Sequence, residues 1–342
     1  MTDEVREKCE LLVGNHNAIR KGFFLENELM SAIAGLIFAS AGKEADVEKL
    51  KACRKILKSK TRLLSNLRAE AELVVLSKMA LSDSPEQYLD DYLSVYDKVT
   101  KGKLLENDYM AIAATLILDF GLQDESDEII SKANEIMQRM DKDHPILTSS
   151  EDTSFAIFLA ITRKSADAIL TDLEGGYTYL RETYKVKISA DPVYELCEVL
   201  AVSYGDMEDK CDKVMRLYGA LKERKADFAS NNGLSSLGAL AALDISPEQL
   251  VDEIIDAEAF LKSQKGFNNK EIDASRRLIY STLVVAAVYG KQLEAAGNSV
   301  IVNTLSVIRA KQIAKMISVI CSVAPNVITA VLPEDSTAEN SK

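Results

Sequence analysis

The sequence predicts an all-α protein of about six stacked αα-hairpins, each about 40 residues long, in an α-solenoid-like array flanked by N- and C-terminal helices. Apolar residues recur at steps of three and four, the spacing that aligns side chains on one face of an α-helix. These apolar stripes repeat at intervals of 40 to 42 residues, which is typical of stacked helical repeats. Only 15 glycines and 6 prolines occur in 342 residues, too few for the tight turns that many short strands require.

The repeat is visible in both the polar and the apolar residues. The tetrapeptide Ser84–Gln87 recurs as Ser246–Gln249, four repeat lengths later, and both Ser-Pro pairs are typical of a helix start. Each long stripe ends at an apolar anchor position; the anchors are Leu57, Val99, Met140, Leu180, Leu221 and Leu261. A shorter, nearly all-apolar segment precedes each stripe; the segment centres are Leu36, Leu76, Leu116, Leu159, Leu200 and Leu240. Each unit is therefore expected to hold a short buried helix and a longer amphipathic helix, which must stack on neighbouring units to bury their apolar faces.

The order of segments follows from these boundaries. We expect an N-terminal helix in residues 1–25, the six hairpins in 26–272, an apolar C-terminal helical segment packed on the array in 273–333, and a polar tail in 334–342. The pattern does not say whether the array is open or closes on itself.

The C-terminal segment is more apolar than a solvated helix requires. Val, Ile, Leu, Ala and Met dominate residues 300–332. The apolar surface of this segment can be covered in three ways: by burial under the array, by a homodimer contact with a second subunit, or by insertion into a membrane. Pro325, Asn326 and several hydroxyl side chains weaken the membrane interpretation.

Charge and cysteine content exclude several classes of partner and site. Acidic residues outnumber basic ones by 53 to 41, a net charge of −12, which argues against general binding to nucleic acid or an anionic membrane. The N-terminus lacks the apolar stretch of a signal peptide. The five cysteines form no Cys-x-x-Cys pair and the chain has two histidines. We therefore expect a cytoplasmic protein with reduced thiols, no metal site and no cofactor.

Few residues suggest chemistry, and common nucleotide, zinc-protease and serine-hydrolase motifs are absent. His144 lies among acids and could transfer protons, with Glu151 and Asp152 as nearby carboxylates. Helix capping by residues 148–152 and a loop-packing role for His144 are the competing interpretations. Arg276 and Arg277 are candidates for an interaction site, although nearby helix acids are the expected partners of this pair.

Three segments resemble a known family. They are GKEADVEKLKACRKILK at residues 42–58, HPILTSSED at residues 144–152 and QKGF at residues 264–267. In this order they resemble the bacterial domain of unknown function family 4003, over nearly the whole chain. The resemblance implies a bacterial cytosolic protein and supplies no activity.

Two functions stay open. The first is a non-enzymatic scaffold whose helical repeats bind a protein or peptide partner. The alternative is a hydrolase-like enzyme in which the hairpins close into an αα-toroid with an acidic cavity, using His144 and nearby carboxylates. Sugar-processing toroids usually line such a cavity with aromatic residues, whereas this chain has no Trp and 6% aromatic residues.

Overall fold

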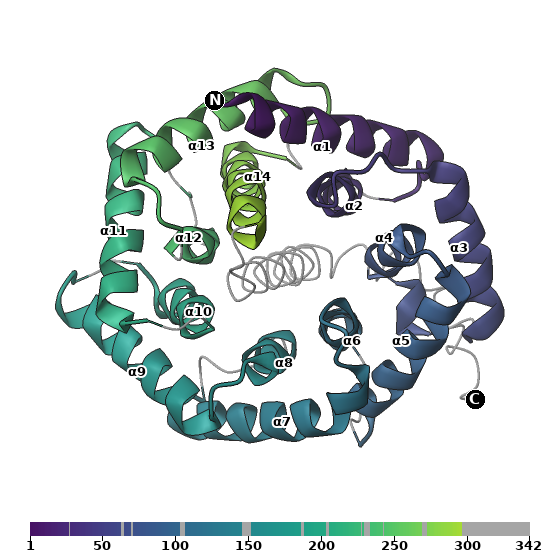
Figure 1. Ribbon diagram of the computed structural model, residues 1–342, viewed down its shortest axis with the longest axis horizontal. Coiled ribbons are helices and arrows are strands. Elements are labelled where there is room, and N and C mark those ends of the chain that lie inside the picture. The colour runs from purple at the N-terminus through teal and green to yellow at the C-terminus, as the bar shows by residue number, and fades with distance from the viewer. Residues whose placement is uncertain are drawn as a thin grey trace, which may run out of the picture.

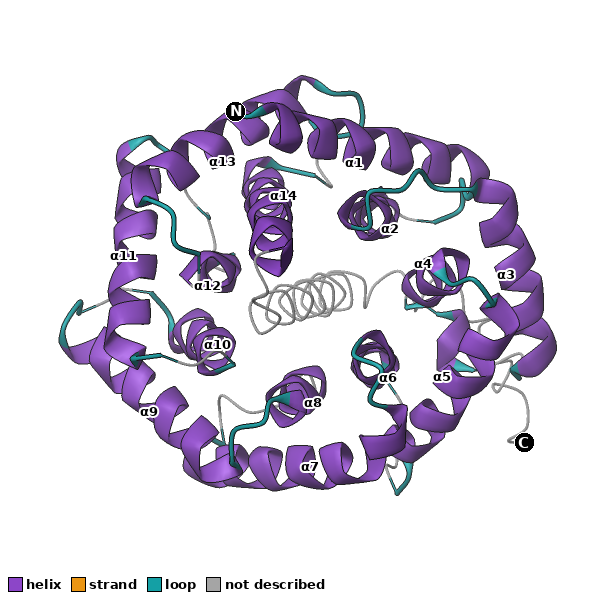
Figure 2. Ribbon diagram, viewed as in Figure 1, coloured by secondary structure: helices purple, strands orange, loops and turns teal. Residues whose placement is uncertain are grey.

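The computed structural model describes residues 1–295, except 27, 63, 64, 70, 103–106, 146–151, 186, 187, 203, 204, 227, 229–232, 242 and 269–271. Within these residues the chain is helical and contains no strand (Figure 2), which confirms the prediction of an all-α protein. The α-helices are α1 Asp3–Gly22, α2 Glu28–Ser40, α3 Val47–Lys60, α4 Glu72–Leu81, α5 Pro85–Thr100, α6 Asp108–Asp119, α7 Ser126–Asp143, α8 Thr153–Ile161, α9 Ala166–Glu182, α10 Ala190–Ala201, α11 Met207–Glu223, α12 Leu234–Ala241, α13 Pro247–Ser263 and α14 Ala274–Ala295. Two short 3-10 helices, Asn66–Arg68 and Gln123–Glu125, lie between them.

The helices form two concentric layers (Figure 1). The odd-numbered helices make an outer ring, and the even-numbered helices stand inside it. Each outer helix contacts the inner helix that follows it in the chain, and neighbours contact one another around both rings. The first and last described helices also meet: α1 packs on α13 and α14, and α14 packs on α2. We call this junction the seam. The described helices therefore form a closed ring.

Amphipathic sequences explain the outer layer. All six anchors are at most 4% exposed, and each lies on an outer helix from α3 to α13. The cap of α13 follows the sequence pattern, because Ser246 Oγ accepts a hydrogen bond from Gln249 N at 3.2 Å and Pro247 occupies the first turn. Ser84 occupies the same position before α5, but its side chain makes no capping hydrogen bond. The repeated tetrapeptide therefore marks two helix starts that are capped differently.

The inner helices are apolar around most of their circumference. Every described residue of α2 from Leu29 to Ser40 is buried, as is every residue of α12. Hydroxyl side chains within these helices bond to their own backbone; Ser77 Oγ, for example, donates to Leu73 O at 2.7 Å. The inner layer therefore holds much of the hydrophobic core.

Lysines of the outer helices bind the ends of the inner helices. Lys49 Nζ donates to Ser82 O at 3.0 Å, just after α4, and Lys132 Nζ donates to Thr162 O at 2.7 Å, just after α8. Lys213 Nζ donates in the same way to Leu243 O after α12. Each of these lysines lies eight residues before an anchor. An ammonium group at a helix C-terminus satisfies free carbonyls and complements the helix dipole.

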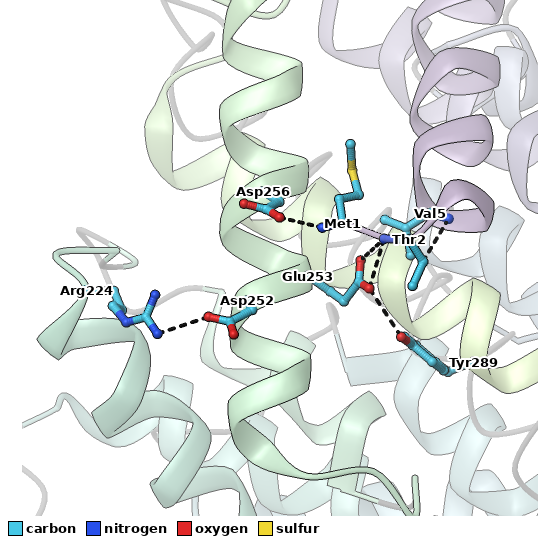
Figure 3. Close-up of polar contacts among 8 residues, drawn as sticks. All are labelled: Met1, Thr2, Val5, Arg224, Asp252, Glu253, Asp256 and Tyr289. Atoms are coloured by element: carbon cyan, nitrogen blue, oxygen red, sulfur yellow. Dashed lines mark hydrogen bonds and ion pairs between the residues drawn. The ribbon is translucent and has the colours of Figure 1, made fainter.

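Polar contacts close the seam between α13 and the start of α1 (Figure 3). Thr2 N lies 3.0 Å from both carboxylate oxygens of Glu253, and Met1 N contacts Asp256. Tyr289 of α14 donates its hydroxyl to Glu253 Oε1 at 3.4 Å. The Glu253 carboxylate on α13 therefore binds both Thr2, which caps α1, and Tyr289 of α14.

Helix α14 covers the first part of the predicted C-terminal segment. Its residues from Leu278 to Tyr289 are buried. Residues 296–342, which include the rest of that segment and the polar tail, lie outside the described residues, and the predicted homodimer contact falls there. None of the described helices is long and apolar enough to span a membrane.

Candidate functional site

An exposed apolar pair lies in the connection between α1 and α2. Phe24 is 73% exposed and Leu25 is 86% exposed. Among the described residues, the other large hydrophobic side chain on the surface is Tyr184, at 37%. Exposure of large apolar groups side by side is a known mark of interaction sites.

The neighbouring helix α3 carries a strong positive charge. Residues 47–62 contain seven Lys and Arg against the single acid Glu48, in a chain whose net charge is −12. The end of α1 and the start of α3 approach closely, because a Cβ atom on Gly22 would overlap Val47. The absence of a side chain at residue 22 thus brings the exposed pair beside the basic helix.

Part of this positive charge serves the fold. Lys49 binds the end of α4, and Lys60 pairs with Asp90 at 2.5 Å on α5. Arg54 contacts both Glu26 and Glu72. Burial raises the pKa of Glu72, and the Arg54 guanidinium opposes that rise. These three cations have structural partners.

The three other lysines of α3 face solvent, and Arg62 is exposed beyond the end of the helix. Lys51 pairs with Glu48 at 2.8 Å, but both side chains are well exposed, so the pair is weak. Lys55 and Lys58 are exposed, and no described acid lies within ion-pair distance of either. We call Phe24, Leu25, Lys51, Lys55 and Lys58 the docking surface.

A pocket of about 530 Å³ lies beside the exposed pair and includes the three lysines of the docking surface in its lining. Gly22, Phe23 and Ala52 supply its apolar lining, and Glu48, Lys51, Arg54, Lys55 and Lys58 supply charge. The Arg54 guanidinium lies 4.7 Å from the centre of the Phe23 ring, a favourable cation–π contact between two residues of the pocket wall. The pocket can therefore hold an apolar group close to several cations.

His144, the predicted acid–base candidate, ends α7, where its N–H donates to Met140 O at 2.7 Å. Its Nε2 lies 2.8 Å from Glu174 Oε2, and Tyr194 donates to the other oxygen of Glu174 at 3.4 Å. The imidazole also packs edge-on against Tyr177 and Tyr194, with ring centres 5.8 and 5.1 Å away. Burial raises the pKa of Tyr194, which keeps its hydroxyl a donor. Glu174 was not among the sequence candidates, because a contact 30 residues away gives no local signal.

The other predicted residues are distributed over the ring. Asp152 precedes α8 and makes no side-chain cap there, whereas Glu151 lies outside the described residues. Arg276 pairs with Asp273 at 3.3 Å at the start of α14. Arg277 is 4% exposed and donates to Glu258 at 2.7 Å and to Phe267 O at 3.0 Å. Arg277 thus holds the connection between α13 and α14, and its guanidinium faces the interior.

In the described part of the chain, possible metal ligands are dispersed and the cysteines are buried. No three His, Cys, Asp or Glu side chains gather there in a way that could hold a metal ion. Cys9, Cys53, Cys197 and Cys211 are buried free thiols. Burial raises the pKa of Cys9 and Cys211 to about 12, so both stay protonated near neutral pH.

Comparison with known proteins identifies a family. The sequence model described as "protein of unknown function (DUF4003)" matches residues 15–313. No curated protein and no solved structure matches the chain.

Proposed function

Because the chain belongs to the DUF4003 family, whose description names no activity, we propose a function from its surfaces: a non-enzymatic helical-repeat scaffold of the bacterial cytosol that binds a partner protein. The docking surface is the observation that carries this proposal. It places two strongly exposed apolar side chains beside three exposed lysines, of which Lys55 and Lys58 have no described acid within ion-pair distance.

The free-energy cost of leaving this surface exposed to water supports a binding role for it. Each Å² of apolar area left in water forgoes about 25 cal/mol of burial free energy. Lys55 and Lys58 lie close together on α3, and neither has a described acid within ion-pair distance, so their ammonium groups repel each other. A partner that covers Phe24 and Leu25 and neutralises these lysines would remove both costs.

The helical ring carries the docking surface on its outer side. Repeat spacing near 40 residues, buried anchors and lysines at equivalent positions all support a helical-repeat, solenoid-derived architecture. In a closed ring the inner helices are buried, so a partner meets the outer wall and the loops. The proposed function therefore uses the outside of the ring, in place of the concave groove of an open solenoid.

Affinity purification from the native host, with crosslinking, tests this function. We expect one stoichiometric protein partner with the wild-type chain and its loss with Phe24→Ser/Leu25→Ser. Tyr184→Ser is the control, since Tyr184 is also an exposed large hydrophobic residue but lies between α9 and α10; it also removes the hydrogen bond to Asp212, so folding of this variant is checked by its melting temperature. Recovery of no protein, or of the same partner with the double variant and the control alike, would contradict the proposal.

The closed ring and the His144–Glu174 pair favour one alternative: a hydrolase-like αα-toroid enzyme. Glu174 could orient the imidazole for proton transfer. His144→Gln tests this, because it removes the basic nitrogen while keeping a hydrogen-bonding side chain. A hydrolase substrate panel that shows turnover by the wild-type chain and none by a folded His144→Gln variant would favour the enzyme over the scaffold.

A further inference from the structure

We propose that the docking surface recognises an acidic peptide segment of a partner protein, with an apolar side chain of that segment seated in the pocket beside α3. This inference rests on the proposed function and deepens it by assigning the chemistry of the partner.

Charge complementarity selects an acidic occupant. Lys51, Lys55 and Lys58 extend along the exposed side of α3 at steps of four and three, so their ammonium groups form one row. Lys49, Arg54 and Lys60 are occupied by contacts within the fold, and the row is the part of the positive charge of α3 that a partner can use. Carboxylates spaced along a peptide would pair with it, and such pairing also speeds encounter.

The pocket selects an apolar anchor. Its volume of about 530 Å³ lies within the usual range for binding pockets, about 300 to 1,000 Å³. Phe23 and Ala52 offer apolar contact, and the aliphatic parts of the lysine side chains extend it. Phe24 and Leu25 follow Phe23 directly in the chain and are exposed, so a partner that fills the pocket would also reach them.

Two other classes of macromolecule fit less well. A flat anionic membrane would engage the exposed pair but would leave the pocket empty and press Glu48, one of its lining residues, against negative headgroups. A single-stranded nucleic acid would stack on aromatic side chains, yet Leu25 is aliphatic and is more exposed than Phe24. A peptide uses the row, the pocket and both loop residues together.

Selection from a phage-displayed library of random peptides, roughly twelve residues long to match an extended or helical ligand, tests this proposal on the full chain. We expect enriched sequences that combine several Asp or Glu with a Leu, Ile, Phe or Met. A synthetic peptide of the consensus should bind about tenfold or more weakly to Lys51→Glu/Lys55→Glu/Lys58→Glu, because the reversed charges repel it. Binding should also weaken as salt is raised.

A matched variant separates local from global charge. Lys101→Glu/Lys142→Glu/Lys222→Glu makes the same change in net charge at exposed positions on or next to α5, α7 and α11, and it should bind the peptide like wild type. Both triple variants should stay folded, since none of the six lysines is buried. Each set removes positive charge from the last turn of at least one helix and should lower the melting temperature slightly. This comparison keeps the test valid even if net charge alters binding in general.

Defined outcomes overturn the inference. No enrichment, a consensus without acids, or equal effects of the two triple variants would each refute the acidic-peptide assignment. Sedimentation with phosphatidylglycerol vesicles provides another arm: vesicle binding that Phe24→Ser/Leu25→Ser abolishes, without an acidic consensus, would assign the surface to a membrane. If instead the native partner is retained by Lys51→Glu/Lys55→Glu/Lys58→Glu, the scaffold function stands and this surface assignment fails.

Discussion

Glu253 holds the seam of the ring, and its removal should destabilise the whole chain. The carboxylate is 5% exposed, lies 3.0 Å from Thr2 N and accepts the Tyr289 hydroxyl at 3.4 Å. Glu253→Ala leaves a partly buried N–H without its acceptor, which costs about 1–3 kcal/mol when water cannot replace it. Thr2 is itself exposed, so water offsets part of this cost. We expect a loss of about 1–2 kcal/mol in the free energy of unfolding.

The neighbouring residue Asp252 gives a matched control in the same helix turn (Figure 3). It pairs with Arg224 at 3.0 Å, but both side chains are more than half exposed. Asp252→Ala also removes one acid from α13, so the two variants carry the same net charge. An exposed pair contributes about 0–1 kcal/mol, and we expect Asp252→Ala to lie near the bottom of this range.

Urea unfolding at neutral pH, followed by circular dichroism, measures both variants. Glu253→Gln should fall between wild type and Glu253→Ala, because its amide oxygen still accepts a hydrogen bond from Thr2 N. Equal stability of Glu253→Ala and Asp252→Ala would refute the reasoning, since the seam would then contribute no more than a surface ion pair.

Three other changes test the core, a helix end and a buried histidine. Leu221→Ala should lower the free energy of unfolding by roughly 2–5 kcal/mol, because this anchor is fully buried in α11; a loss below about 1 kcal/mol in urea unfolding would contradict its core position. Lys132→Met should cost about 1–2 kcal/mol through lost bonds to the end of α8, whereas Lys142→Met, at an exposed position on α7, should be nearly neutral by the same measurement. Burial lowers the pKa of His16 from 6.5 to about 4, so the folded chain loses stability as pH falls from 6.5 toward 4. Between pH 7 and 5, urea unfolding should show about 2 kcal/mol more loss in wild type than in His16→Leu; parallel pH profiles would show that His16 is not the titrating group.

His16 illustrates why the local environment sets such a shift. Its ring is 1% exposed and packs edge-on against Phe267 at 4.9 Å, while Gly266 lies so close that a Cβ there would meet the imidazole. Glu28 Oε1 is 3.9 Å from Nε2, but burial and, to a smaller extent, the Arg20 charge disfavour the protonated ring and lower its pKa. Protonation therefore places a charge in an apolar site at the seam.

Periodicity in the sequence was sufficient to predict the helices and the buried anchors. Steps of three and four depend on local helix geometry, so Leu57 or Leu261 can be assigned to a core-facing stripe without any tertiary information. The lysines that bind the ends of the inner helices could also have been predicted from the sequence, because Lys49, Lys132 and Lys213 all lie eight residues before an anchor. The repeated lysine is a weaker pattern than the apolar stripes, which dominate the sequence periodicity.

Ring closure and the docking surface depend on contacts that periodicity does not encode. Closure requires the small rotation between successive hairpins to bring Thr2 to Glu253, 251 residues away. The apolar residues Phe24 and Leu25 would be assigned to a core from their type alone, and only the folded loop leaves them exposed. The positive charge of α3, in contrast, could have been read directly from residues 47–62 as a candidate interaction face.

Site-specific photocrosslinking in the native host tests the central claim that the outer wall near α3 binds a partner protein. A photoreactive amino acid would replace Leu25 in the full chain, with Glu128, exposed on α7, as the control position. The account predicts one discrete protein adduct at Leu25, mapped to an acidic segment of the partner, and none at Glu128. Absence of a protein adduct at Leu25, or the same adducts at both positions, would contradict it.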